Sequence, residues 1–209
     1  MSPLPGYEHW YDCTRCELHQ YRSHVVLGHG NPDADIMIIG SWPVSQDDLC
    51  GVPFQGMEGE ALDLLLGDVG WAREELFLDN VVACWPPKDD GKYLSTGKAD
   101  AESIRMCRTR IMRTIYDVDP LIIVVLGIDA VQGLFGQKIR LGNARSTQEF
   151  LSVPGQLKFV KYPMFTTYHP ADILKQGVDP RPTTPYETAK RDFAFINRHV
   201  AMLRELYRQ

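Results

Sequence analysis

Short, uninterrupted apolar runs rich in β-branched residues are the feature of this sequence that most restricts its fold. They are Ile36–Ile39, Leu76–Leu78 with Val81–Val82 just beyond, Leu121–Leu126 and Met164–Tyr168. Apolar runs of this length without polar alternation are typical of parallel strands that are buried on both faces. We therefore expect a sheet whose two faces are both covered by other elements.

Helical periodicity fills the gaps between these runs. Apolar residues recur every three or four positions over Glu60–Leu66, Asp100–Tyr116, Asp129–Phe135 and the long segment Glu187–Tyr207. Alternating strands and helices predict an α/β fold, a three-layer α/β/α sandwich with a central, mostly parallel four-stranded sheet. At 209 residues, the whole chain (1–209) is expected to form one domain.

The N-terminal residues carry no basic segment followed by an apolar one, so no secretory signal is expected. No apolar run approaches the roughly 20 residues that a membrane span needs. These features predict an intracellular protein without a membrane partner.

Charge is divided unevenly along the chain. Residues 1–104 hold 6 Lys and Arg against 18 Asp and Glu, and residues 105–209 hold 16 against 9, for a net charge of −5. A basic second half can offer a face for phosphate even when the summed charge is negative. Candidate residues for such a face are Lys138, Arg140, Arg145, Lys158, Lys161, Lys175 and Arg181. Ordinary solvated helix faces are the alternative for the other basic residues of this half.

Four of the five cysteines are candidates for a metal site: Cys13 and Cys16 in a CxxC, then Cys84, then Cys107 in a basic helical segment. Disulfides are rare in a reducing cytosol, so four thiolates point to an iron–sulfur cluster or to zinc. Spacing alone also leaves room for unrelated thiols. Cys50 is interpreted as a structural thiol and is not assigned to the metal.

The chemistry of open α/β sheets lies at the carboxyl ends of the strands. In this sequence those ends are Ser41–Phe54, Asn80, Gly127 and His169. They are therefore the positions at which we expect a functional site.

The motifs at these positions occur in the order seen in family 4 uracil-DNA glycosylases, which the sequence resembles from Cys13 to about Leu174. They are Gly30-Asn-Pro-Asp, Gly40-x-x-Pro43, Asp47-Asp48, Gly51-x-Pro-Phe-x-Gly56, Asn80-Val-Val-x-Cys84-x-Pro-Pro, Leu126-Gly and Thr167-Tyr-His-Pro170. The resemblance implies one α/β domain with a [4Fe–4S] cluster held by Cys13, Cys16, Cys84 and Cys107. It also implies excision of uracil from DNA, leaving an abasic site, by a cytoplasmic, nucleoid-associated protein that we expect to be a monomer.

Physical chemistry assigns roles to residues of these motifs. An excised base must leave the stack for a pocket, where Phe54 would stack on it and Asn80 would pair with O4 and N3. His169 would donate to O2 of the departing uracil anion. Asp47 or Asp48 would position the attacking water. Gly40, Ser41 and Trp42 complete the predicted substrate pocket. Each residue also has a structural alternative, as core, cap or solvated loop.

The segment after His169 resembles the loop with which the family wedges into duplex DNA. Leu174 would fill the hole left by the flipped base, and Lys175 would contact phosphate. The structural alternative is an ordinary first helical turn.

The first motif departs from the family pattern. It usually reads Gly-Glu-Ala-Pro-Gly, whereas here it is Gly40-Ser41-Trp42-Pro43-Val44, with a carboxylate lost and an indole gained. Three alternatives therefore remain beside uracil excision. They are a glycosylase for another, modified pyrimidine, a catalytically silent DNA- or uracil-binding module, and a protein in which the four thiolates hold zinc.

Overall fold

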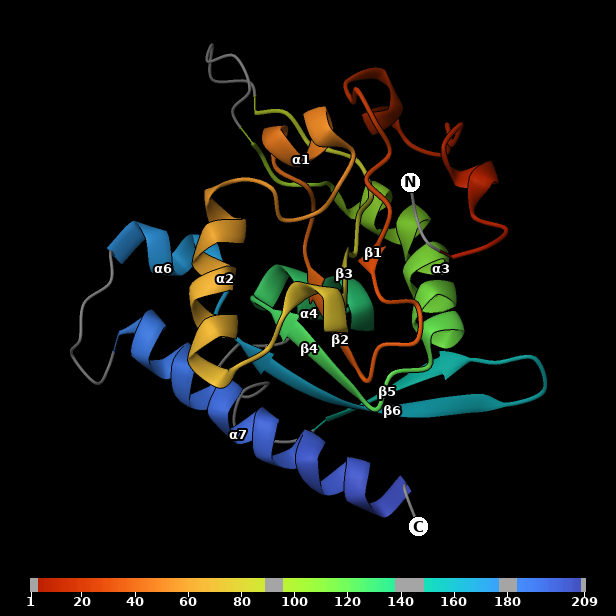
Figure 1. Cartoon of the computed structure of the whole chain (residues 1–209). Coiled ribbons are helices and arrows are strands. Elements are labelled where there is room, and N and C mark those ends of the chain that lie inside the picture. The colour runs from red at the N-terminus through yellow and green to blue at the C-terminus, as the bar shows by residue number, and fades with distance from the viewer. Residues whose placement is uncertain (1–3, 89–95, 138–148, 177–183, 208–209) are drawn as a thin grey trace.

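The computed structural model of the protein describes residues 4–88, 96–137, 149–176 and 184–207 (Figure 1). These residues form a six-stranded sheet. In the order of the sheet, the strands are β1 (His29–Gly30), β3 (Leu76–Asn80), β2 (Ile36–Gly40), β4 (Ile122–Leu126), β6 (Phe159–Thr167) and β5 (Glu149–Pro154).

The four predicted apolar runs are the four central strands, and all of them run parallel. The predicted count of four strands is wrong for the whole sheet, because β1 and β5 add an antiparallel strand at each edge. Strand β1 has only two residues, and β5 alternates exposed with buried positions, so neither carries a continuous apolar run. Val81 and Val82 lie beyond the end of β3.

Six helices accompany the strands: α1 (Ser45–Cys50), α2 (Met57–Val69), α3 (Ala101–Val118), α4 (Ile128–Phe135), α6 (Pro170–Gln176) and α7 (Pro185–Tyr207), counted over the described ranges. Four of them, α2, α3, α4 and α7, are the helices expected from periodicity. The ends follow local chemistry. The carboxylate of Asp100 accepts the N–H of Ser103 at 2.6 Å and caps α3, and α2 ends at Gly70 in the left-handed conformation.

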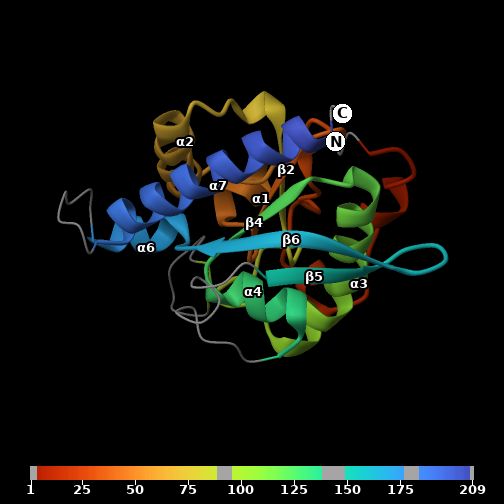
Figure 2. The same cartoon turned by 90° about the horizontal axis from the view of Figure 1, so that it is seen from below.

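Alternate residues of each central strand enter two separate cores. Ile36 and Ile38 of β2 pack with α2 and α7, whereas Met37 and Ile39 pack with α3, α4 and the N-terminal segment. Figure 2 shows α2 and α7 on one side of the sheet and α3 and α4 on the other. The predicted three-layer α/β/α sandwich is confirmed.

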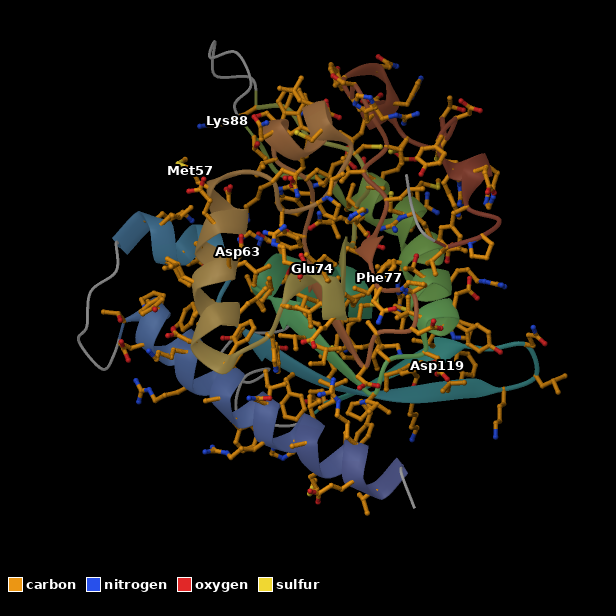
Figure 3. All side chains as sticks on the ribbon, in the orientation of Figure 1. Met57, Asp63, Glu74, Phe77, Lys88 and Asp119 are labelled. Atoms are coloured by element: carbon orange, nitrogen blue, oxygen red, sulfur yellow. The ribbon has the colours of Figure 1, made fainter. Side chains whose placement is uncertain are left out.

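Side-chain bonds fasten α3 at its carboxyl-terminal end. Asp119, which ends the helix, accepts the hydroxyl of Tyr162 from β6 at 2.7 Å, and Asp117 accepts the hydroxyl of Tyr7 at 3.0 Å. Figure 3 shows Asp119 beside the β5–β6 hairpin. The helix is thus tied both to the edge of the sheet and to the N-terminal segment.

One ion pair lies wholly inside the protein. The Arg110 guanidinium on α3 donates to the Asp79 carboxylate on β3 at 2.7 Å, and the two side chains are 1% and 0% exposed. The same guanidinium also donates to the backbone carbonyls of Asn80 and Val81. Arg110 therefore fixes the carboxyl end of β3 against α3.

No helix in the described ranges is long and apolar enough to cross a membrane.

We expect Arg110→Met to lower the free energy of unfolding by about 3–5 kcal/mol, because it leaves the Asp79 carboxylate buried and unpaired. The midpoint of urea unfolding measures this loss. Replacing both partners, in Arg110→Met/Asp79→Leu, should recover a large part of it. A loss below about 1 kcal/mol in the single variant would contradict a structural role for the pair.

Candidate active site

A cleft of about 650 Å³ opens at the carboxyl ends of the parallel strands. Its lining comes from the ends of β2, β4 and β6, the first turn of α2 and the segment around Thr96. The lining residues that concern the site are Ser41, Trp42, Val44, Glu58, Lys88, Lys98, Gly127, Asp129, His169, Asp172 and Lys175. The cleft lies where open α/β sheets place their ligands.

Gly40, Phe54 and Asn80 meet at the carboxyl ends of β2 and β3, and none of the three is among the residues that line the cleft. Gly40 and Asn80 are register partners on β2 and β3. A Cβ on Gly40 would stand 2.3 Å from the Asn80 amide oxygen and 2.8 Å from the Phe54 ring. Glycine is therefore required here, because any side chain would separate the ring from the amide.

The Asn80 side chain is 2% exposed, and its Nδ2 has no hydrogen-bond partner among the described residues. A buried N–H without an acceptor costs about 1–3 kcal/mol, so a partner from outside the chain would be favourable. The Arg110 bond to the carbonyl of Asn80 holds the backbone of this residue in place.

Phe54 has a φ of 58°, which is unusual for an aromatic residue and stores strain. The Arg73 guanidinium donates to the Phe54 carbonyl at 2.9 Å and to the Gly59 carbonyl at 3.2 Å. Asp63 of α2 binds Arg73 in turn. This positioning role of Arg73 could not be read from sequence patterns, because the contact is made through backbone carbonyls.

His169 lies beside Gly127, where a Cβ would approach the Cβ of His169 to 2.8 Å. Its Nδ1 is 3.1 Å from the N–H of Ala171, so Nδ1 accepts and the ring proton is assigned to Nε2. Burial lowers the pKa of His169 to about 4, although Asp172 and Asp129 act in the opposite direction. The ring is thus neutral at pH 7 and has one N–H to donate.

The structure places Asp47 and Asp48 in the backbone framework of the site. Asp47 accepts the N–H of Gln55 at 2.6 Å and that of Val44 at 3.1 Å. Asp48 accepts the N–H groups of Ser23 and His24 at 2.7 and 3.2 Å. Both residues are 3% exposed and neither is among the residues that line the cleft. Burial raises the pKa of Asp47, and its bonds from backbone N–H groups oppose that rise.

Ser41 and Trp42 both line the cleft, as predicted for substrate-binding residues, and Ser41 is 7% exposed. Trp42 also lines a second cavity of about 470 Å³ against α3 and α4. The ion pair of Lys98 and Asp129, with oxygens 3.2 Å from the nitrogen, borders both cavities as well. Trp42 and this pair therefore stand between the two spaces.

Leu174 and Lys175 lie on α6, directly after His169. Leu174 is 42% exposed, and the Lys175 amine is 3.2 Å from the Asp172 carboxylate. An exposed leucine beside a cleft can enter another molecule without first leaving the protein core.

The four predicted metal-binding cysteines, Cys13, Cys16, Cys84 and Cys107, line one small cavity together with Arg22 and Arg110. Burial raises the pKa of Cys84 to about 12, the nearby Arg22 lowers it, and the neighbouring Cys107 and Cys16 raise it further. Arg22 lies 3.4 Å from the Cys84 sulfur. Cys50 is exposed and lies outside this group, as expected.

The geometry of the thiols bears on the kind of metal site. Zinc holds four sulfurs about 2.3 Å from one point. Within the described ranges, no three His, Cys, Asp or Glu side chains are placed to hold a single ion. Within the described residues the four thiols thus share one cavity but do not form a site for a single ion.

The predicted phosphate-binding face is described only in part. Lys138, Arg140, Arg145 and Arg181 lie outside the described residues. Lys158 and Lys161 are at the beginning of β6, and Lys175 lies beyond its end. Among the described residues, the lysines that gather at the cleft are instead Lys88, Lys98 and Lys175.

Comparison with known proteins identifies the family. The model of the uracil DNA glycosylase superfamily matches residues 27–197. The chain is 32% identical over 167 residues to a type-4 uracil-DNA glycosylase of Saccharolobus solfataricus, an alignment that covers 78% of this chain and 72% of that protein. Type-4 uracil-DNA glycosylases of Pyrobaculum aerophilum and Thermotoga maritima are 30% and 31% identical over 169 and 164 residues. These alignments cover 79% and 78% of this chain, and 81% and 78% of those proteins.

The match extends over most of the fold, including the cleft and the strands that form it. It confirms the resemblance expected from the ordered motifs. This chain therefore belongs to the uracil DNA glycosylase superfamily, within its type-4 family.

Proposed function

We propose that this protein excises uracil from DNA by hydrolysing the N-glycosidic bond, which leaves an abasic site. Membership of the family and the similarity to three type-4 uracil-DNA glycosylases support this activity. The observation that carries it is the buried, unpaired amide of Asn80 beside the Phe54 ring. A flipped uracil offers both an acceptor for that N–H and a flat face for that ring.

Residues at the carboxyl ends of the strands would share the work of base release. Phe54 stacks on the flipped uracil, and Asn80 donates to O4 and accepts from N3. Neutral His169 donates its Nε2–H to O2, where negative charge develops as the bond to C1′ breaks. A neutral donor suits this task, because it stabilises the anion without having to lose a charge afterwards.

DNA would be held at the mouth of the cleft. Leu174 fills the space left by the flipped base, and Lys175 binds a neighbouring phosphate, helped by Lys88 and Lys98. Asp47 keeps the loop between β2 and α2 in shape, and Asp48 ties α1 to residues 23 and 24. A monomer in the compartment that holds the DNA is sufficient for this activity.

Cys13, Cys16, Cys84 and Cys107 would hold a [4Fe–4S] cluster, for which their shared cavity is the supporting observation. Such a cluster would cross-link separate segments of the chain. It would join the N-terminal segment and the residues after β3 to helix α3. No step of base release depends on it.

A 5-modified pyrimidine is a second candidate substrate. Trp42 separates the cleft from the cavity of about 470 Å³ beside it, so the position of its ring sets how large a base can enter.

The first test uses a labelled oligonucleotide with one deoxyuridine, with thymidine and 5-hydroxymethyluridine oligonucleotides as controls, followed by alkaline cleavage. We expect cleavage at uracil, and a loss of about 100-fold or more in His169→Ala because one donor to the leaving anion is removed. Cleavage at 5-hydroxymethyluridine alone would support the second candidate. DNA binding without any cleavage would indicate a silent module.

Asn80→Ala should reduce the rate of uracil release far more than it weakens DNA binding, since the amide contacts the base and not the backbone. Single-turnover rates and fluorescence anisotropy separate the two effects. Equal losses in rate and affinity would make Asn80 a scaffold residue instead.

Cys84→Ser should give a colourless protein of lower thermal stability, because one of four cluster ligands is lost. Iron content and visible absorption measure the cluster, and Cys50→Ser is the matched control that should keep both. A stable, fully active Cys84→Ser protein would argue against the [4Fe–4S] cluster. Wild-type protein that contains zinc and no iron would show that the four thiolates hold zinc instead.

A further inference from the structure

Hydrolysis at C1′ requires a group that holds the attacking water, and the following inference rests on the proposed excision of uracil. The two aspartates expected from the sequence, Asp47 and Asp48, each accept two backbone N–H groups. Neither lines the cleft. A carboxylate that already accepts two backbone bonds, and that does not face the cleft, is poorly placed to bind the water.

Two of the carboxylates that do line the cleft are paired with lysines. Asp129 binds Lys98 through both oxygens at 3.2 Å, and Asp172 binds Lys175 at 3.2 Å. Each lysine competes with water for the oxygens of its partner. These two acids are therefore weak candidates.

Glu58 differs from the four aspartates. It is half-buried, lines the same cleft as Ser41 and His169, and has no hydrogen bond or ion pair in the part of the chain that the structure describes. Its Oε2 lies 3.4 Å from the position of a Cβ on Gly56, so the carboxylate rests on a glycine surface.

Glu58 lies at the beginning of α2. It is the second residue of a 13-residue helix, where the unpaired backbone N–H groups stabilise negative charge. Figure 3 shows the preceding residue, Met57, and the cleft residue Lys88 at this end of α2. Glu58 thus combines negative charge, access to the cleft and free oxygens.

We propose that Glu58 is the carboxylate that holds and deprotonates the attacking water. The water oxygen forms a bond to C1′ while the bond from C1′ to N1 of uracil breaks. The electron pair of the broken bond leaves with the uracil. Glu58 accepts one proton of the water and then releases it to solvent. His169 supports the leaving uracil from its O2 side.

Ser41 provides an independent way to test this role. It lines the same cleft from the end of β2, at the position where the first motif of the family usually carries a glutamate. A carboxylate moved from Glu58 to position 41 would enter the same space from another element.

The experiment compares Glu58→Gln with Glu60→Gln, an exposed glutamate in the same helical turn. Full-length proteins are assayed for single-turnover release of uracil and for affinity to deoxyuridine-containing DNA. We expect Glu58→Gln to slow release at least about 100-fold, with affinity and melting temperature nearly unchanged, because only the water loses its base. Glu60→Gln should behave as wild type, and Ser41→Glu should restore part of the rate in the Glu58→Gln background.

Release by Glu58→Gln within about twofold of wild type would overturn the inference and leave the proposed function standing, since wild-type activity is measured beside it. A loss of affinity as large as the loss of rate would make Glu58 a DNA contact and would also overturn it. Wild-type protein that releases no uracil would overturn the proposed function, and this inference with it.

Discussion

The buried pair of Arg110 and Asp79 is the interaction on which the arrangement of this protein depends. One guanidinium neutralises a buried carboxylate near the carboxyl end of β3, binds the carbonyls of Asn80 and Val81, and borders the cavity of the four cysteines. The end of β3 and the cavity of the cysteines therefore share this cation. Losing it would disturb the candidate base pocket and the candidate metal site together.

Some polar residues of the site hold its backbone in place, and others have polar atoms available to a ligand. Asp47 accepts the backbone N–H groups of Val44 and Gln55 and so shapes the loop that carries Phe54, whereas Asp48 accepts those of Ser23 and His24 and ties α1 to the N-terminal segment. The Asn80 Nδ2 has no partner among the described residues, and His169 and Glu58 line the cleft. A buried carboxylate whose oxygens accept backbone hydrogen bonds stabilises a loop. A carboxylate whose oxygens accept none can take up a proton.

The central part of the fold was predictable because a strand that is buried on both faces is an uninterrupted apolar run in the sequence, as in Ile36–Ile39. The edge strands were not, since β5 alternates and β1 is too short for any pattern. The ordered motifs led to Asn80 and His169, which lie at the strand ends as expected. They could not reveal that Asp47 faces the backbone or that Glu58 faces the cleft. Side-chain direction in a loop depends on contacts, such as Arg73 with the Phe54 carbonyl, between residues distant in sequence.

The strained backbone of Phe54 has a consequence for how the protein responds to salt. Arg73 holds that backbone through a hydrogen bond to the Phe54 carbonyl. Asp63 orients Arg73 in turn, and half of the Asp63 side chain is exposed. Ions in solution weaken partly exposed pairs of this kind as well as contacts with phosphate. Ionic strength therefore acts at two places: on the lysines proposed to bind DNA, and on the ion pair that holds the backbone of Phe54.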